Sequence, residues 1–153
     1  MSYVFKETKY STFYIYTYFW GSINTVSTLN TPQYDPYVKS IAKDLDFLDS
    51  NMYVLIKSIY SENFDINQAK IQISFINSLI YDLSKKGSDL PQEQNDVAAA
   101  LQAILGFYKL SIIEADRYLY SKNSDDLINA INAFSMGYTA SINLRNIVFR
   151  AGK

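Results

Sequence analysis

Apolar residues that recur every three or four positions from Val38 onward restrict the fold more than any other feature of the sequence. This spacing places side chains along one side of an α-helix, which has about 3.6 residues per turn. Asp35 is a suitable N-cap, and Pro36 is favoured in the first turn of a helix. We therefore predict a helix over 35–61. Its buried side is predicted to comprise Val38, Ile41, Leu45, Leu48, Met52, Leu55 and Ile59. The residues predicted to face water are Lys39, Lys43, Asp46, Asp49, Ser50 and Lys57.

Similar patterns predict three further helices. Asp65 and Ser124 are the expected N-caps of two of them, and Gly87 is expected to end a helix in the left-handed conformation. The predicted helices span 65–86, 91–121 and 124–151. The last of them is predicted to bury Leu127, Ile131, Phe134, Tyr138, Ile142, Arg145 and Phe149.

Long helices joined by short polar loops pack most simply against their neighbours in the sequence, in antiparallel pairs. The predicted fold class is all-α, an up-down antiparallel bundle of four long helices in a single domain, 1–153. The turns at 60–65 and 120–125 are similar, which fits either a duplicated helical hairpin or shared turn chemistry.

Residues 1–33 form an aromatic-rich segment with no charged residue after Lys9. Aromatic and β-branched residues favour strands, but a lone strand in a helical chain would need a partner from another subunit. The spacing of Phe13, Tyr16 and Trp20 favours a helix, and these residues are the candidate partner interface. The uncharged stretch 10–34 contains eleven Ser, Thr, Asn or Gln residues, so it lacks the apolar run of roughly 18 to 20 residues that spans a membrane. We predict an additional N-terminal helix that packs on the core or docks on a second copy.

The chain contains no cysteine and no histidine. This excludes disulfides, thiolate and imidazole metal sites, Ser-His-Asp triads and histidine acid–base catalysis. Glu114 and Asp116, two positions apart, point to different sides of a helix. Asp125 and Asp126 sit at a predicted helix start, where acids have a capping or electrostatic role and face water. The glycines form no phosphate-binding loop. We therefore predict no enzyme activity, no cofactor and no metal.

Arg145 falls on the apolar side predicted for the last helix. Its stem is expected to lie on apolar neighbours while its guanidinium reaches water at the end of the bundle. It begins the segment Arg145-Asn146-Ile147-Val148-Phe149-Arg150, which resembles the Arg-Asn-x-x-x-His motif of the helical HEPN nucleases. Arg150 stands where that family has histidine. The resemblance implies an RNA-associated bundle that lacks the acid–base partner needed for cleavage.

The last third of the chain, 104–152, resembles a small archaeal helical-hairpin family of unknown function. An acidic residue of that family's second helix is replaced here by Ser141 or Asn143. The resemblance implies an archaeal source and a helical bundle, and it implies no activity. The matching residues are Phe107-Tyr108, Ala115-Asp116, Tyr118-Leu119, Lys122-Asn123, Ala130, Ala133-Phe134-Ser135 and Gly137-Tyr138.

The leading functional hypothesis is a non-enzymatic interaction or structural protein that self-associates as a homo-oligomer. The absence of a recognisable targeting segment favours the cytoplasm. The alternative is a nucleic-acid-associated regulator or inactive HEPN-like bundle that uses Arg117, Arg145 and Arg150 on phosphates. The net charge of −1 provides no overall field that attracts nucleic acid.

Overall fold

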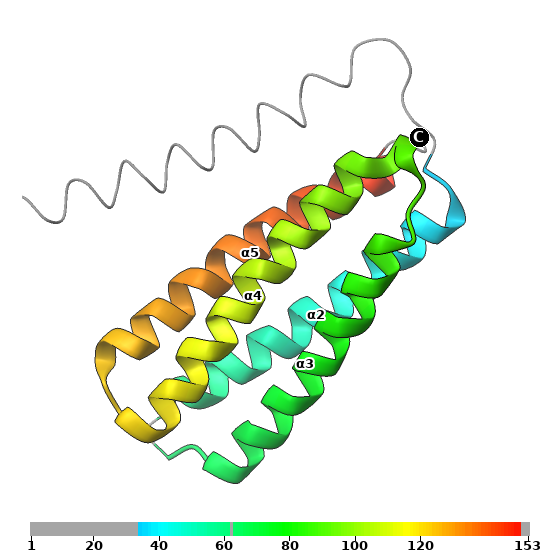
Figure 1. Ribbon diagram of the computed structural model, residues 1–153. Coiled ribbons are helices and arrows are strands. Elements are labelled where there is room, and N and C mark those ends of the chain that lie inside the picture. Colours follow the sequence, from blue (N-terminus) through cyan, green and yellow to red (C-terminus); the bar gives the residue numbers. More distant parts are fainter. Residues whose placement is uncertain (1–33, 62, 151–153) are drawn as a thin grey trace, which may run out of the picture. The chain divides into compact units, whose positions relative to one another are not determined.

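The computed structural model describes residues 34–61 and 63–150, and this part of the chain is an all-α bundle (Figure 1). Each long helix runs antiparallel to the next, α2 and α4 lie diagonally opposite, and each contacts both α3 and α5. The fold class predicted from the sequence is confirmed. The elements are α2 (Pro36–Tyr60), α3 (Ile66–Ser88), a short 3-10 helix η1 (Gln92–Gln94), α4 (Asn95–Ser121) and α5 (Ser124–Arg150).

The chain divides into two units, Met1–Gln33 and Tyr34–Lys153, and the bundle belongs to the second. The predicted N-terminal helix, with Phe13, Tyr16 and Trp20, lies outside the described residues. The prediction of one domain over 1–153 therefore stays a prediction.

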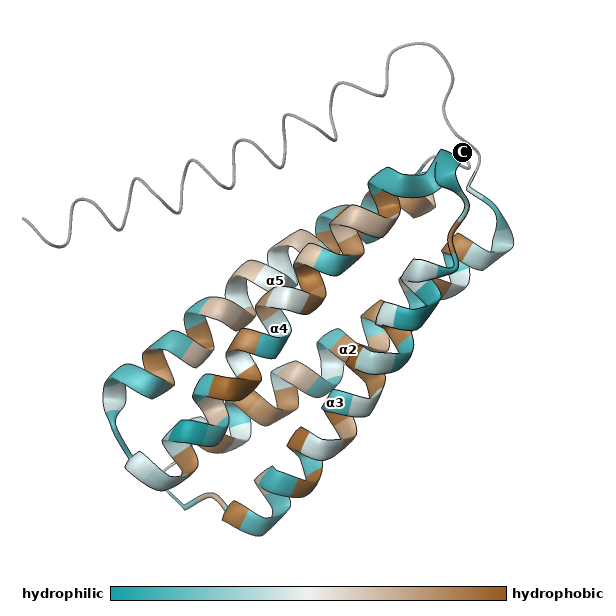
Figure 2. Cartoon of the chain, in the orientation of Figure 1, coloured by the Kyte–Doolittle hydropathy of each residue, from teal (hydrophilic) through white to brown (hydrophobic). Residues whose placement is uncertain are grey.

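The core is formed by the apolar side of each helix, and Figure 2 shows hydrophobic and hydrophilic residues alternating along all four. Every residue predicted to be on the buried side of α2 is buried, from Val38 to Ile59. The strict spacing of three and four therefore identified this surface correctly. The largest fully buried side chains are Tyr108, Ile41, Leu45, Leu48, Met52, Leu55, Ile59, Ile76, Ile80, Leu101, Ile104 and Leu105.

The starts of α2 and α3 are capped by the two aspartates that the sequence indicates. Asp35 Oδ1 accepts a hydrogen bond from the Val38 N–H at 2.9 Å. Asp65 Oδ1 accepts from the N–H groups of Asn67 at 2.8 Å and Gln68 at 3.2 Å. These bonds satisfy backbone donors that have no partner inside the helix.

Replacing Asp65 with alanine is expected to lower the free energy of unfolding by about 1 kcal/mol, because two N–H groups at the start of α3 lose their acceptor. Asp65→Asn should keep most of the stability, since its amide oxygen can still accept. Urea denaturation of both variants measures the difference, and an equal loss in the two would contradict the capping role.

Three helix ends differ from the prediction. The helix predicted from residue 91 begins as the 3-10 helix η1, and α4 starts only at Asn95. Gly87 does not end α3 in a left-handed conformation. No glycine in the described part of the chain has positive φ, and α3 continues to Ser88. Its lack of a side chain matters for packing, since a Cβ there would lie 2.9 Å from Leu101 Cδ2. Ser124 is the first residue of α5, and the cap is Asn123, whose Oδ1 accepts from the Asp125 N–H at 3.0 Å.

The buried side predicted for α5 is wrong except at Phe134, which is buried. Tyr138 and Phe149 are exposed, and Leu127, Ile131 and Ile142 are only partly covered. The buried residues of α5 are mostly small, and they let this helix lie close to α4, while the bulky residues flank the contact. They are Asp126, Ala130, Ala133, Phe134, Gly137, Ser141, Leu144 and Val148.

The closeness of α4 and α5 is clearest at Gly137. A Cβ on this residue would lie 2.6 Å from Cε1 and 2.7 Å from Cδ1 of Tyr108. One turn away on the same contact, Ser111 Oγ donates a hydrogen bond to the Ala130 carbonyl at 2.8 Å. The ring of Tyr108 therefore lies directly on the backbone of α5.

Candidate functional site

A buried carboxylate joins three helices in the middle of the bundle. Asp49 of α2 was predicted to face water, but it is only 2% exposed, so that prediction is wrong. Its Oδ1 accepts a hydrogen bond from Tyr108 Oη of α4 at 2.5 Å. Its Oδ2 accepts from Ser141 Oγ at 2.6 Å and from Arg145 Nη2 at 2.8 Å, both on α5. A buried charge is stable only with such partners.

Burial shifts the protonation of this cluster in one direction. Desolvation raises the pKa of Asp49 above its usual value, although the hydrogen bonds from Ser141 and Tyr108 and the positive charge of Arg145 oppose the shift. Burial, together with the neighbouring Asp49 charge, raises the pKa of the Tyr108 phenol well above its ordinary value. Tyr108 is therefore a permanent donor to Asp49, and it cannot serve as a general base.

Arg145 does not reach out to water as expected from the sequence. Its Nη1 lies 2.5 Å from Asp46 Oδ1 and its Nη2 lies 2.8 Å from Asp49 Oδ2, with 19% of the side chain exposed. The guanidinium turns towards α2 because two carboxylates there offer charge-assisted hydrogen bonds. Arg145 thus neutralises Asp49 and closes the network at its surface end.

A shallow depression of about 240 Å³ lies beside this network, between α2 and α5. Both oxygens of Asp49 already accept hydrogen bonds from the protein. The arrangement therefore ties α2 to α4 and α5 inside the bundle. The lining residues are Asp46, Asp49, Ser50, Tyr53, Val54 and Tyr138.

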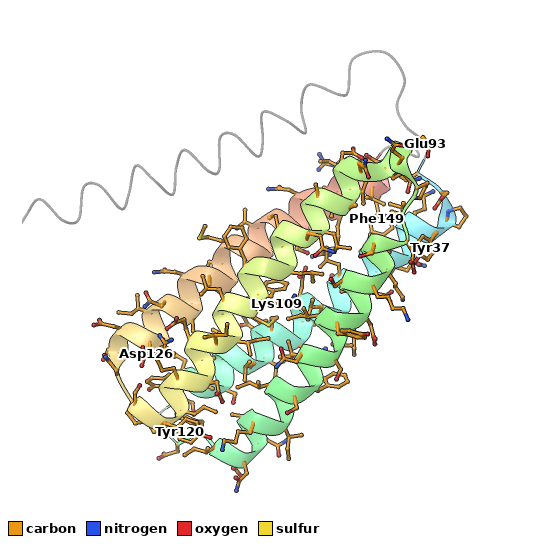
Figure 3. The ribbon with its side chains drawn as sticks, viewed as in Figure 1. Tyr37, Glu93, Lys109, Tyr120, Asp126 and Phe149 are labelled. Carbon is orange, nitrogen blue, oxygen red and sulfur yellow. The ribbon has the colours of Figure 1, made fainter. Side chains whose placement is uncertain are left out.

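A second polar cluster ties α4 to α5 at the turn between them. Arg117 Nη1 lies 2.8 Å from Glu114 Oε2 and 3.9 Å from Asp126 Oδ1. Ser121 Oγ donates to Asp126 Oδ2 at 2.5 Å. Asp126 was predicted to be solvated or to cap the helix, but it is buried because these donors cover it. Figure 3 shows Asp126 and Tyr120 at this end of the bundle, with Glu93 and Phe149 at the other.

The structure does not bring the three candidate phosphate-binding arginines together. Arg117 pairs with Asp126 in the first turn of α5, whereas Arg145 pairs with α2 near the other end of α5. Arg150 is exposed at the last position of α5. Two of the three guanidiniums are already engaged by carboxylates, which leaves less positive charge for a phosphate backbone.

No group of three or more Asp or Glu residues that could hold a metal ion occurs within 34–61 and 63–150. No protein-family model matches the sequence, and searches among curated proteins and among solved structures find no significant match. The resemblances to the HEPN nucleases and to the archaeal helical-hairpin family therefore stay predictions.

A second apolar surface, missed by the sequence analysis, runs along the side of α4 that faces away from the core. We name it the outer stripe, and its positions are again three or four apart. Leu110 is 47% and Ile113 is 55% exposed, and a Cβ on Gly106 would meet no atom within 4 Å. The sequence feature that could have indicated this surface is the absence of charged residues from 97 to 108. The core residues in this stretch also recur every three or four positions, and they mask the spacing of the outer residues. The outer stripe comprises Ala99, Ala103, Gly106, Leu110 and Ile113.

Proposed function

We propose that the protein is a non-enzymatic interaction protein that self-associates through the outer surface of its helices. The observation that supports this proposal is that α4 is apolar on two opposite sides. One side fills the core with residues such as Leu101 and Tyr108, and the other side is the outer stripe. A surface helix normally has one apolar side, which faces the core, so a second apolar side is a candidate contact surface for another molecule.

The length and composition of Gln92–Ser121 also indicate that this part of the chain has more apolar surface than the bundle buries. Among the described residues, this segment is long and apolar enough to cross a membrane, a property shared by core helices of soluble proteins. Only 44% of its most apolar window is buried in the bundle. Covering exposed apolar surface gains about 25 cal/mol per Å², which is a driving force for association.

The polar interior supports a non-enzymatic role. The buried carboxylates Asp49, Glu114 and Asp126 accept hydrogen bonds or ion pairs from neighbouring side chains. The contacts of Asp49 and Asp126 join one helix to another, and Glu114 holds Arg117, which reaches Asp126 on α5. These carboxylates are therefore occupied by contacts within the bundle, whereas the exposed apolar surface of the helices is free to contact another molecule.

Sedimentation equilibrium of the full chain tests the proposal. We expect a mass above the 17.5 kDa of one chain that rises with protein concentration. Because apolar contacts are not screened by ions, the association should persist in high salt. A strictly monomeric chain at several hundred micromolar would contradict the proposal.

A further inference from the structure

We propose that two copies of the chain pair through the outer stripe of α4, in antiparallel orientation, about a twofold axis that passes by Gly106. This inference rests on the proposed self-association and specifies its surface and geometry. The partner is therefore a second copy of this chain, joined by the same patch on both subunits.

In this orientation, large residues in the outer stripe of one copy lie opposite small residues in the outer stripe of the other. The two small residues Ala99 and Ala103 lie before Gly106, and the two large residues Leu110 and Ile113 lie after it at similar distances. In an antiparallel pair centred on Gly106, Leu110 of one copy faces Ala103 of the other. Ile113 likewise faces Ala99. Each large side chain then fills the space beside a small one, as knobs fill holes.

Gly106 suits the position closest to the axis. It is exposed, and a Cβ there would touch nothing within 4 Å of its own bundle. A glycine in the middle of a helix costs about 0.5–1 kcal/mol relative to alanine. Packing inside one chain gives no reason for this cost, whereas the close approach of a second helix does.

Charge also favours the antiparallel orientation. Asp96 and Arg117 flank the outer stripe at its two ends, and both are exposed. An antiparallel pair brings Arg117 of one copy close to Asp96 of the other, at both ends of the contact. A parallel pair would place like charges together and large residues opposite large ones. Arg117 contacts Glu114 and Asp126 through Nη1 alone and is 55% exposed, so the rest of its guanidinium can reach a further carboxylate.

The exposed apolar surface of α2 and α3 fits a second copy less well. Phe47 and Phe75 pack edge to face on each other, with ring centroids 6.3 Å apart, and partly cover one another. The exposed apolar residues nearby, Val54 and Ile71, are also large, so the apolar residues of this surface do not divide into small and large as those of the outer stripe do. It serves as the control surface.

A cysteine placed at Gly106 tests the geometry, because the chain has no cysteine of its own. In Gly106→Cys the two cysteines of the dimer would face each other across the axis. Their Cα atoms would be close enough for a disulfide, which requires a Cα–Cα distance of roughly 4.4–6.8 Å. We expect a covalent dimer on mild oxidation of the full chain. Val54→Cys, at another exposed position, on the control surface, should remain uncrosslinked.

Gly106→Leu provides a second measurement that does not depend on oxidation. The Cβ of the new side chain meets no atom of its own bundle within 4 Å, so the fold should persist, while the dimer dissociation constant should rise at least tenfold. An unchanged dissociation constant together with no crosslink at position 106 would overturn this inference and leave self-association standing. A monomeric wild-type chain would overturn both proposals. So would a monomer that sediments with phosphatidylcholine vesicles, because lipid would then cover the outer stripe.

Discussion

Replacing Gly137 with alanine is expected to destabilise the bundle by about 2 kcal/mol, within the range for overpacked cores. The added Cβ would lie 2.6 Å from a ring carbon of Tyr108. The ring cannot easily turn away, because its hydroxyl is bonded to Asp49 and its side chain is fully buried. Relief would require α4 and α5 to move apart, which would loosen the small-residue contact along both helices. Urea denaturation followed by circular dichroism measures the loss.

Gly106→Ala is the matched control, because it makes the same chemical change at an exposed position of α4, whereas Gly137 lies in the buried contact between α4 and α5. Nothing lies within 4 Å of its new Cβ, so only the helix propensity changes. We expect a gain of about 0.5–1 kcal/mol at concentrations where the chain is monomeric. Similar effects of the two substitutions would contradict the close packing of Gly137 on Tyr108.

Replacing Arg145 with methionine is expected to cost about 3–5 kcal/mol at neutral pH, because Asp49 would be left as a buried charge without its cation. Burial already raises the pKa of Asp49, and loss of the guanidinium raises it further. The folded state then binds a proton more tightly than the unfolded state does. Its stability is retained below the unfolded pKa and is lost as pH rises through the folded pKa. The cost should therefore shrink in mild acid.

Two comparisons separate this effect from simple loss of a surface charge. Arg150→Met changes an exposed arginine on the same helix and should alter stability little. The double variant Asp49→Asn with Arg145→Met removes both charges and should recover much of the loss. A cost that is the same at every pH, or that the double variant does not reduce, would contradict the assigned role of Arg145.

The sequence predicted α2 accurately because its information is local. The spacing of three and four is free of interruptions, and Asp35 lies one residue before the helix that it caps. The burial of Asp49 was not predictable in this way. Its position beside Leu48 is at the edge of the apolar side, and its partners Tyr108 and Ser141 lie far along the chain. Only their convergence in space converts a surface aspartate into a core one.

The failure on α5 has a different cause. A search for large apolar residues follows Leu127, Tyr138 and Phe149, whereas the core contact depends on small residues such as Ala130 and Gly137. Small residues contribute little apolar area, but they let two helices approach closely. Their importance appears only when the facing residue, here Tyr108, is known. The outer stripe of α4 was missed for a related reason. The core residues of this helix already give the expected spacing of three and four, so the second apolar side was not sought.

The carboxylate of Asp49 draws its partners from α4 and α5, and α3 supplies none of them. The polar contacts that hold α3 to its neighbours are exposed or partly exposed, such as Lys86 to Asp44 and Ser84 to Gln102. Water can replace these contacts at little cost. The buried polar network thus connects α2, α4 and α5, whereas α3 is held in the bundle mainly by its apolar side. We therefore expect α3 to be the first helix to open while the other three stay together.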